Sequence, residues 1–105
     1  YSENVTIVTS AVKSIFRYEI RMSEAELREK TSAQVAKILK ELRKERGLSM
    51  TELAARSGLS RAMISFIENE LRNPTLDTLL RIAAVLNVEL ADVLRDARKS
   101  AKSAK

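Results

Sequence analysis

Cysteine and histidine, the side chains most often used for metal binding and nucleophilic chemistry, are both absent from this chain of 105 residues. Their absence excludes disulfides and thiolate or imidazole metal sites, and it removes the commonest general base. Catalysis would have to use carboxylates, Lys, Tyr, Ser or Thr. The carboxylates stand at helix-surface spacing, which is typical of solvated charge. We therefore expect no catalytic residue, no metal and no cofactor.

Basic side chains give the chain its clearest chemical character, a formal net charge of +5. They gather in residues 35–46 and in residues 95–105, whereas charges of the two signs balance over residues 47–74. A basic chain of this kind fits a polyanionic partner, although many basic proteins simply have basic surfaces.

Helix starts are the strongest local signals. Three Ser/Thr-x-x-Glu/Gln capping boxes begin at Ser23, Thr31 and Ser49, and two further starts are expected at Ser60 and Thr75. Apolar residues recur at helical spacing between these starts. Each helix is too short to persist alone, so the pattern predicts a compact, mainly α bundle over about residues 32–95.

Residues 1–22 follow a different pattern. From Lys13 to Met22 apolar and charged residues alternate, which predicts a half-buried strand with one apolar face. That face comprises Phe16, Tyr18, Ile20 and Met22. A helical interpretation through Val12, Ile15, Phe16 and Ile20 stays open. We expect a short helix, Ser23–Lys30, to link this arm to the bundle.

The segment Met50–Asn69 has the pattern of two short helices that cross over a tight turn. Small Ala54 lies where the helices would approach, and Gly58 suits a turn residue with positive φ. Ile64 and Ile67 would hold the second helix against the first.

Five motifs of this region resemble, in order and spacing, the Cro/repressor-type (XRE) helix-turn-helix family over about residues 33–95. They are Gly47-Leu48-Ser49-Met50-Thr51-Glu52-Leu53-Ala54, Ser57-Gly58-Leu59-Ser60, Ile64-Ser65-Phe66-Ile67-Glu68-Asn69, Arg72-Asn73-Pro74-Thr75-Leu76 and Leu79-Leu80-Arg81-Ile82-Ala83. The resemblance implies a five-helix, lambda-repressor-like domain whose third helix enters the DNA major groove.

The resemblance also implies roles for single residues. Base contacts would come from the outward face of the third helix, at Arg61, Ala62, Ser65 and Phe66. For Phe66 two roles stay open, contact with a thymine methyl group or cover for the edge of the motif. Arg43 and Glu68 match an ion pair of the family that fixes the third helix.

Phosphate contacts are expected from six polar residues, each of which could instead serve only in capping or solvation. They are Ser49, Thr51, Ser60, Asn69, Arg72 and Asn73. The chain departs from the family at Met50, where Gln is common, and at Glu70, where Gly is usual.

The expected organisation is an N-terminal dimerisation arm at residues 1–31, a DNA-binding domain at residues 32–97 and a basic flexible tail at residues 98–105. Leu90, Val93 and Leu94 of the last helix would add to the contact between two copies. Because residues 47–74 have no net charge, a monomer should bind DNA weakly. Affinity would need a homodimer, or the basic first helix and tail.

The sequence therefore predicts a dimeric transcriptional regulator, most simply a repressor, that binds a palindromic site in double-stranded DNA. The alternative is the DNA-binding antitoxin of a toxin–antitoxin pair, whose arm would fold on a protein partner. A small helical enzyme would need a carboxylate cluster in a deep pocket. No apolar run reaches the ~20 residues that span a bilayer, and no signal peptide is recognisable. We expect a cytoplasmic location, no membrane contact and no small-molecule ligand.

Overall fold

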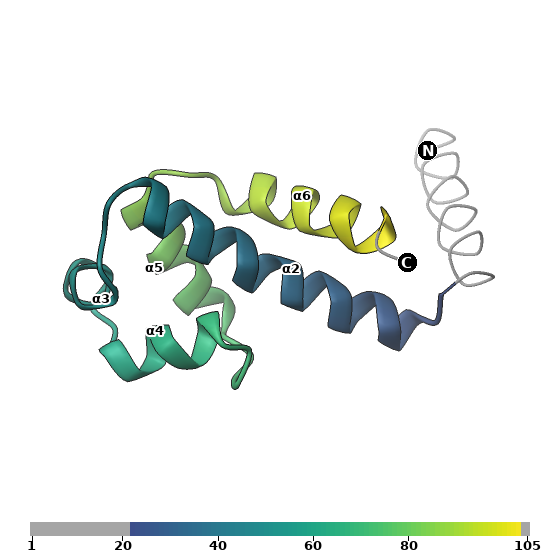
Figure 1. Cartoon of the computed structure of the whole chain (residues 1–105), viewed down its shortest axis with the longest axis horizontal. Helices are drawn as coiled ribbons and strands as arrows, with labels where there is room; N and C mark the ends of the chain where they lie inside the picture. Colours follow the sequence, from purple (N-terminus) through teal and green to yellow (C-terminus); the bar gives the residue numbers. More distant parts are fainter. Residues whose placement is uncertain (1–21, 104–105) are drawn as a thin grey trace, which may run out of the picture.

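The computed structural model describes residues 22–103, which form five α-helices and no strand (Figure 1). The helices are α2 (Glu24–Glu45), α3 (Met50–Ser57), α4 (Arg61–Glu68), α5 (Leu76–Leu86) and α6 (Leu90–Ser103). The predicted five-helix fold is confirmed. The predicted β arm, with Phe16, Tyr18 and Ile20, lies outside the described residues.

Side-chain caps set the starts of four helices. The hydroxyl oxygens of Ser23, Ser49, Ser60 and Thr75 each accept a hydrogen bond from the backbone N–H three residues further on. At α3 the box is reciprocal, because the Ser49 N–H donates to the Glu52 carboxylate at 3.1 Å. Local sequence therefore predicts these four starts correctly, since a cap satisfies N–H groups that have no partner inside the helix.

The same box produces a pH dependence that can be measured. The hydrogen bond from the Ser49 backbone N–H, reinforced by the Ser49 hydroxyl, lowers the pKa of Glu52. A lowered carboxyl pKa stabilises the fold above the ordinary glutamate pKa, and this stability is lost as the pH falls through the lowered value. We expect Glu52→Gln to lower the melting temperature slightly at neutral pH and to lose that difference in acid. A difference that persists unchanged in acid would contradict this origin.

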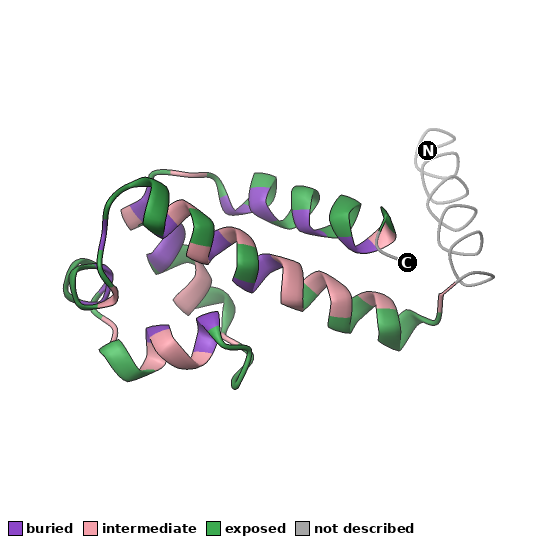
Figure 2. Ribbon diagram, viewed as in Figure 1, coloured by how far each residue is buried: buried purple, intermediate pink, exposed green. Residues whose placement is uncertain are grey.

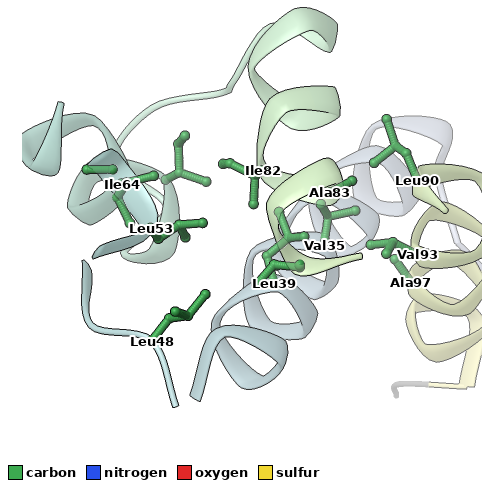
Figure 3. Packing of buried hydrophobic residues seen from close by; sticks show 13 residues of the cluster. Val35, Leu39, Leu48, Leu53, Ile64, Ile82, Ala83, Leu90, Val93 and Ala97 are labelled. Carbon is green, nitrogen blue, oxygen red and sulfur yellow. The ribbon is translucent and has the colours of Figure 1, made fainter. Parts of the chain in front are cut away.

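One apolar cluster joins all five helices. Leu53, Ile64, Ile82 and Leu86 are its most deeply buried large side chains. Figure 3 shows Val35 and Leu39 of α2 close to Ala83 of α5, with Val93 and Ala97 of α6 to their right. The cluster fixes α3 and α4 against the long α2 and against α5.

Helix α6 runs alongside α2, and its buried residues form a stripe on the side that faces α2 (Figures 1 and 2). Ala97 and Ala101 of α6 are fully buried, and Ala36 of α2 is nearly so. Small side chains at these positions allow two helices to approach closely. None of the helices described between residues 22 and 103 is both long enough and apolar enough to cross a lipid bilayer.

The start predicted at Thr31 is wrong, because α2 is one uninterrupted helix of 22 residues. The Thr31 hydroxyl donates to the Leu27 carbonyl at 2.6 Å, so it bonds back into the preceding turn and does not cap a new helix. No Gly or Pro stands between Ser23 and Glu45 to end the helix. The separate linking helix Ser23–Lys30 therefore does not exist, and the predicted boundary at residue 31 falls inside α2.

The flexible tail predicted at residues 98–105 is also wrong for residues 98–103, which continue α6. Val93, Ala97 and Ala101 recur every four residues and are all buried. An Ala-Ser-Lys segment has little apolar periodicity of its own. It stays helical because α2 offers its alanines a surface to pack on.

Candidate nucleic-acid interface

The turn between α3 and α4 has the geometry that its sequence predicts. Gly58 ends α3 in the left-handed conformation, with φ of 75°. The Leu59 N–H donates to the Ala54 carbonyl at 3.1 Å, which closes the turn beside a small buried residue. Ile64 and Ile67 are 1% and 3% exposed, so they hold one face of α4 against the core. The opposite face of α4 is thereby turned outward.

Arg81 of α5 reinforces this turn, a role that the sequence did not reveal. Its Nε donates to the Asp77 carboxylate at 2.8 Å, and its Nη1 donates to the Ser57 carbonyl at 3.4 Å. A β-carbon at Gly58 would lie 3.2 Å from the same Nη1. Gly58 therefore meets two requirements, a positive φ and the close approach of an arginine.

The predicted pair of Arg43 and Glu68 is present and buried. Arg43 Nε donates to Glu68 Oε2 at 2.7 Å, and Arg43 Nη2 donates to Glu68 Oε1 at 2.9 Å. The third nitrogen, Nη1, donates to the Leu48 carbonyl at 2.8 Å. The side chains are only 8% and 3% exposed. One guanidinium thus joins the end of α4 to α2 and to the segment before α3.

Arg43 is held in its protonated, positively charged form in this position. The hydrogen bond to Glu68 raises the pKa of Arg43, with the negative charge of Glu68 adding to the effect, and both outweigh the lowering by burial. Because Glu68 cancels its charge at close range, Arg43 adds little to the positive potential around α4. The basic cluster at residues 35–46 is correspondingly weaker than the sequence indicates.

The four predicted base-contact residues lie along the outward side of α4. Arg61 and Ala62 in the first turn are exposed, and Ser65 and Phe66 in the next are half-buried. Ser65 is engaged within the helix end: the Asn69 side-chain amide donates to the Ser65 carbonyl at 2.9 Å and approaches its hydroxyl at 3.3 Å. The first turn of α4 therefore presents the least obstructed side chains.

Of the six predicted phosphate contacts, two also act as caps. Ser49 and Ser60 accept backbone N–H groups at the starts of α3 and α4. A capping hydroxyl keeps its own hydrogen for a further acceptor, so capping does not exclude a phosphate contact. Thr51 and Asn73 are exposed. These contacts stay a prediction.

Helix α4 ends in a tight turn built on an unusual residue. The Leu71 N–H donates to the Phe66 carbonyl at 2.8 Å and the Glu70 N–H to the Ile67 carbonyl at 3.1 Å, with Glu70 at φ 59°. This is the Schellman pattern, in which the left-handed position is most often Gly. The end of α2 has the same pattern with Gly47 in that position. Glu70 therefore adopts a backbone conformation that is unfavourable for any residue with a β-carbon.

We expect Glu70→Gly to raise the free energy of unfolding by about 1 kcal/mol, because glycine adopts a positive φ without steric cost. Urea unfolding at neutral pH measures the change. Glu70→Ala is the matched control, since it removes the same charge but keeps a β-carbon, and it should give no such gain. Equal gains in the two variants would assign the effect to charge and not to the backbone.

Four of the residues predicted for dimer contact lie in the described part of the chain. Leu90 and Val93 are 7% and 4% exposed inside the core of their own chain, so their prediction as interface residues is wrong. Leu94 is 40% exposed, and half-buried Met22 stands at the start of the described chain. Both line a groove of about 840 Å³ between the first turns of α2, the segment before α5, and α6. Among residues 22–103 no group of acidic side chains could hold a metal ion.

Comparison with known proteins shows which family has this sequence pattern. Residues 39–93 match the model of a family described as helix-turn-helix (HTH_3). The HTH-type transcriptional regulator SutR of Escherichia coli (strain K12) is 48% identical over 50 residues, which are 48% of this chain and 28% of SutR. The HTH-type transcriptional regulator SinR of Bacillus licheniformis is 37% identical over 59 residues, 55% of this chain and 53% of SinR.

A solved structure agrees with these matches. The crystal structure of SinR, the master regulator for biofilm formation, in complex with DNA aligns with a TM-score of 0.55 at 36% identity. The alignment covers 57% of this chain and 97% of the SinR chain in that structure. The present chain spans about half of SinR from Bacillus licheniformis and less of SutR.

Proposed function

The chain belongs to the helix-turn-helix family HTH_3, and on that premise we propose that it is a sequence-specific DNA-binding transcriptional regulator, most simply a repressor. It binds double-stranded DNA with α4 in the major groove. Its relatives SutR and SinR carry the name of transcriptional regulators, and a SinR structure contains DNA.

The observation that carries this proposal is the division of α4 into two faces. Ile64, Ile67 and Glu68 are buried and fix the helix, whereas Arg61 and Ala62 are exposed on a rigid first turn. A guanidinium in that position can donate two hydrogen bonds to the O6 and N7 atoms of guanine, and a methyl group can pack on thymine. In this proposal α4 reads bases, while the caps of α3 and α4 lie near the phosphates.

Selection of bound duplexes from a random DNA pool tests the proposal directly. We expect the recovered sequences to share a motif, and a dimer would give an inverted repeat with half-sites about 34 Å apart. Recovery of unrelated sequences, bound no more tightly than the starting pool, would overturn sequence-specific binding.

We further propose that the regulator acts as a homodimer and that residues 1–22 are its dimerisation element. The segment Met50–Pro74 carries no net charge and Arg43 is neutralised by Glu68, so a single domain has little electrostatic affinity for DNA. Two linked half-sites would supply the missing affinity. In this proposal the chain works in the cytoplasm and needs no cofactor, ligand or catalytic residue.

Deleting residues 1–22 should leave a folded helical domain that binds a half-site but dimerises poorly. Helices α2 to α6 share one core, whose described members extend from Val35 to Ala97. Sedimentation at micromolar concentration measures the assembly of the full and shortened chains. A shortened chain that dimerises as tightly as the full chain would place the interface in the helices, with exposed Leu94 as the first residue to test.

A further inference from the structure

Phe66 is the only aromatic residue of the sequence beyond Tyr18, and an arginine lies over its ring. The Cζ atom of Arg72 is 5.0 Å from the centre of the Phe66 ring, which is within the range of a cation–π contact. Arg72 is exposed, and Phe66 is half-buried at the end of the outward side of α4. The two residues thus form one unit at the edge of the proposed DNA-binding face.

The exit turn of α4 creates this contact. The hydrogen bonds from Leu71 to Phe66 and from Glu70 to Ile67 fold the chain back on the last turn of the helix. Residue 72 therefore returns over residue 66, although six positions separate them in the sequence. Half-buried Pro74 and the cap of α5 at Thr75 follow shortly after Arg72 in the sequence. The chain is therefore restrained on both sides of Arg72.

The guanidinium of Arg72 remains available for an anion. Within residues 22–103 no carboxylate lies at ion-pair distance from it, in contrast to Arg43, Arg81 and Arg95. A cation–π contact holds the guanidinium by its positive charge and does not use up its five N–H donors as hydrogen bonds to an acceptor would. An arginine held in this way loses less side-chain freedom when it binds a phosphate.

We propose that Phe66 is a positioning residue, which holds Arg72 for a phosphate of the DNA backbone and does not itself read a base. This inference rests on the proposed DNA-binding function and deepens it. Of the two roles that the sequence leaves open for Phe66, it rejects contact with a thymine methyl group, and it gives the ring a role beyond cover for the edge of the motif. Because phosphates carry no sequence information, the contribution of Phe66 to affinity is the same on every duplex.

The test is a double-mutant cycle of Phe66→Leu and Arg72→Gln, measured by fluorescence anisotropy with the full chain. Each protein is titrated with the duplex selected from the random pool and with a scrambled duplex of equal length. Arg72→Gln should weaken binding about 3- to 10-fold on both duplexes. It should also reduce the slope of log affinity against log salt concentration by about one, the value for one phosphate contact. Phe66→Leu should weaken binding about 2- to 5-fold on both.

The coupling between the two substitutions tests whether Phe66 acts through Arg72. With Arg72→Gln already present, Phe66→Leu should have almost no further effect, whereas Phe66→Tyr should keep wild-type affinity because it keeps a ring. Circular dichroism and thermal melting of each variant show whether the fold is retained. Because Arg72 is exposed, comparison of Arg72→Gln with Arg72→Lys gives a second measurement that leaves the ring in place. Lysine keeps the charge but lacks the guanidinium group, and it should recover only part of the lost affinity.

Two results would overturn the inference while leaving the proposed function intact. Losses that add independently in the double variant would show that Phe66 and Arg72 act separately. A loss for Phe66→Leu confined to the selected duplex would assign the ring to a base, most simply a thymine methyl group. A wild-type chain that binds no duplex would overturn the proposed function and this inference together.

Discussion

Replacing Arg43 by Ala is expected to lower the free energy of unfolding by about 3–5 kcal/mol, because the change leaves the carboxylate of Glu68 buried without its partner. The Leu48 carbonyl loses its donor at the same time. Small domains are stable by only about 5–15 kcal/mol, so the variant should melt at a much lower temperature. Urea unfolding followed by circular dichroism measures the loss.

Arg46 provides a matched control on the same stretch of chain. It lies three residues further on and donates from Nε to the Leu86 carbonyl at 2.6 Å, but its side chain is 37% exposed. Arg46→Ala should cost about 1 kcal/mol, the usual value for one hydrogen bond. Adding Glu68→Leu to Arg43→Ala should restore part of the stability, because no buried charge is then left unpaired. A loss of about 1 kcal/mol for both arginines would show that the pair at Arg43 has no special role.

The same change should weaken DNA binding even at temperatures where the chain remains folded. Glu68 is the last residue of α4, and Arg43 joins it to α2 and to the segment before α3. Without this joint the angle of α4 depends on apolar packing, in which Ile64 and Ile67 are the buried residues of the helix. A variant that is destabilised but binds the selected duplex with wild-type affinity would limit the pair to stability.

Replacing Arg61 by Ala is expected to cost about 1–3 kcal/mol of binding free energy on the selected duplex and much less on a scrambled one. Arg61 is the first residue of α4 and is exposed, so its replacement disturbs nothing in the core. In the proposed binding mode it removes two hydrogen bonds to a guanine. Anisotropy titrations with the two duplexes give both numbers. The difference between them is the contribution of Arg61 to specificity.

Arg95 is a suitable control for charge alone. It is an exposed arginine on α6, paired with Asp92 at 2.8 Å and outside the proposed DNA-binding face. Arg95→Ala removes one positive charge, as Arg61→Ala does, and should change affinity on neither duplex by more than a small amount. If Arg61→Ala weakens both duplexes equally, Arg61 binds a phosphate and the base contacts must be sought at Ala62 and Ser65.

Much of the candidate site follows from local sequence. The caps at Ser49 and Ser60 and the turn at Gly58 depend on atoms only a few residues apart, so residue types alone indicate them. The spacing of Ile64 and Ile67 then decides which side of α4 turns outward, and with it the exposure of Arg61 and Ala62. The pair of Arg43 and Glu68 was predicted only from the family resemblance, because 25 residues separate its members.

Other features were decided by the tertiary structure, because they depend on what packs against each segment. Thr31 resembles a helix start, but it lies inside α2, since nothing there interrupts the helix. Ala97 and Ala101 lack a strong apolar signal, yet they are fully buried because α2 lies beside them.

The sequence by itself determined where most helices begin, how α3 turns into α4 and which face of α4 is outward, because caps, a positive φ and helical periodicity are local properties. Only the tertiary structure decided that Leu90 and Val93 belong to the core and that Arg81 holds the turn at Ser57. Each of these contacts joins segments that are far apart in the sequence. The spacing of residues along the chain does not show which of these segments lie side by side in the folded protein.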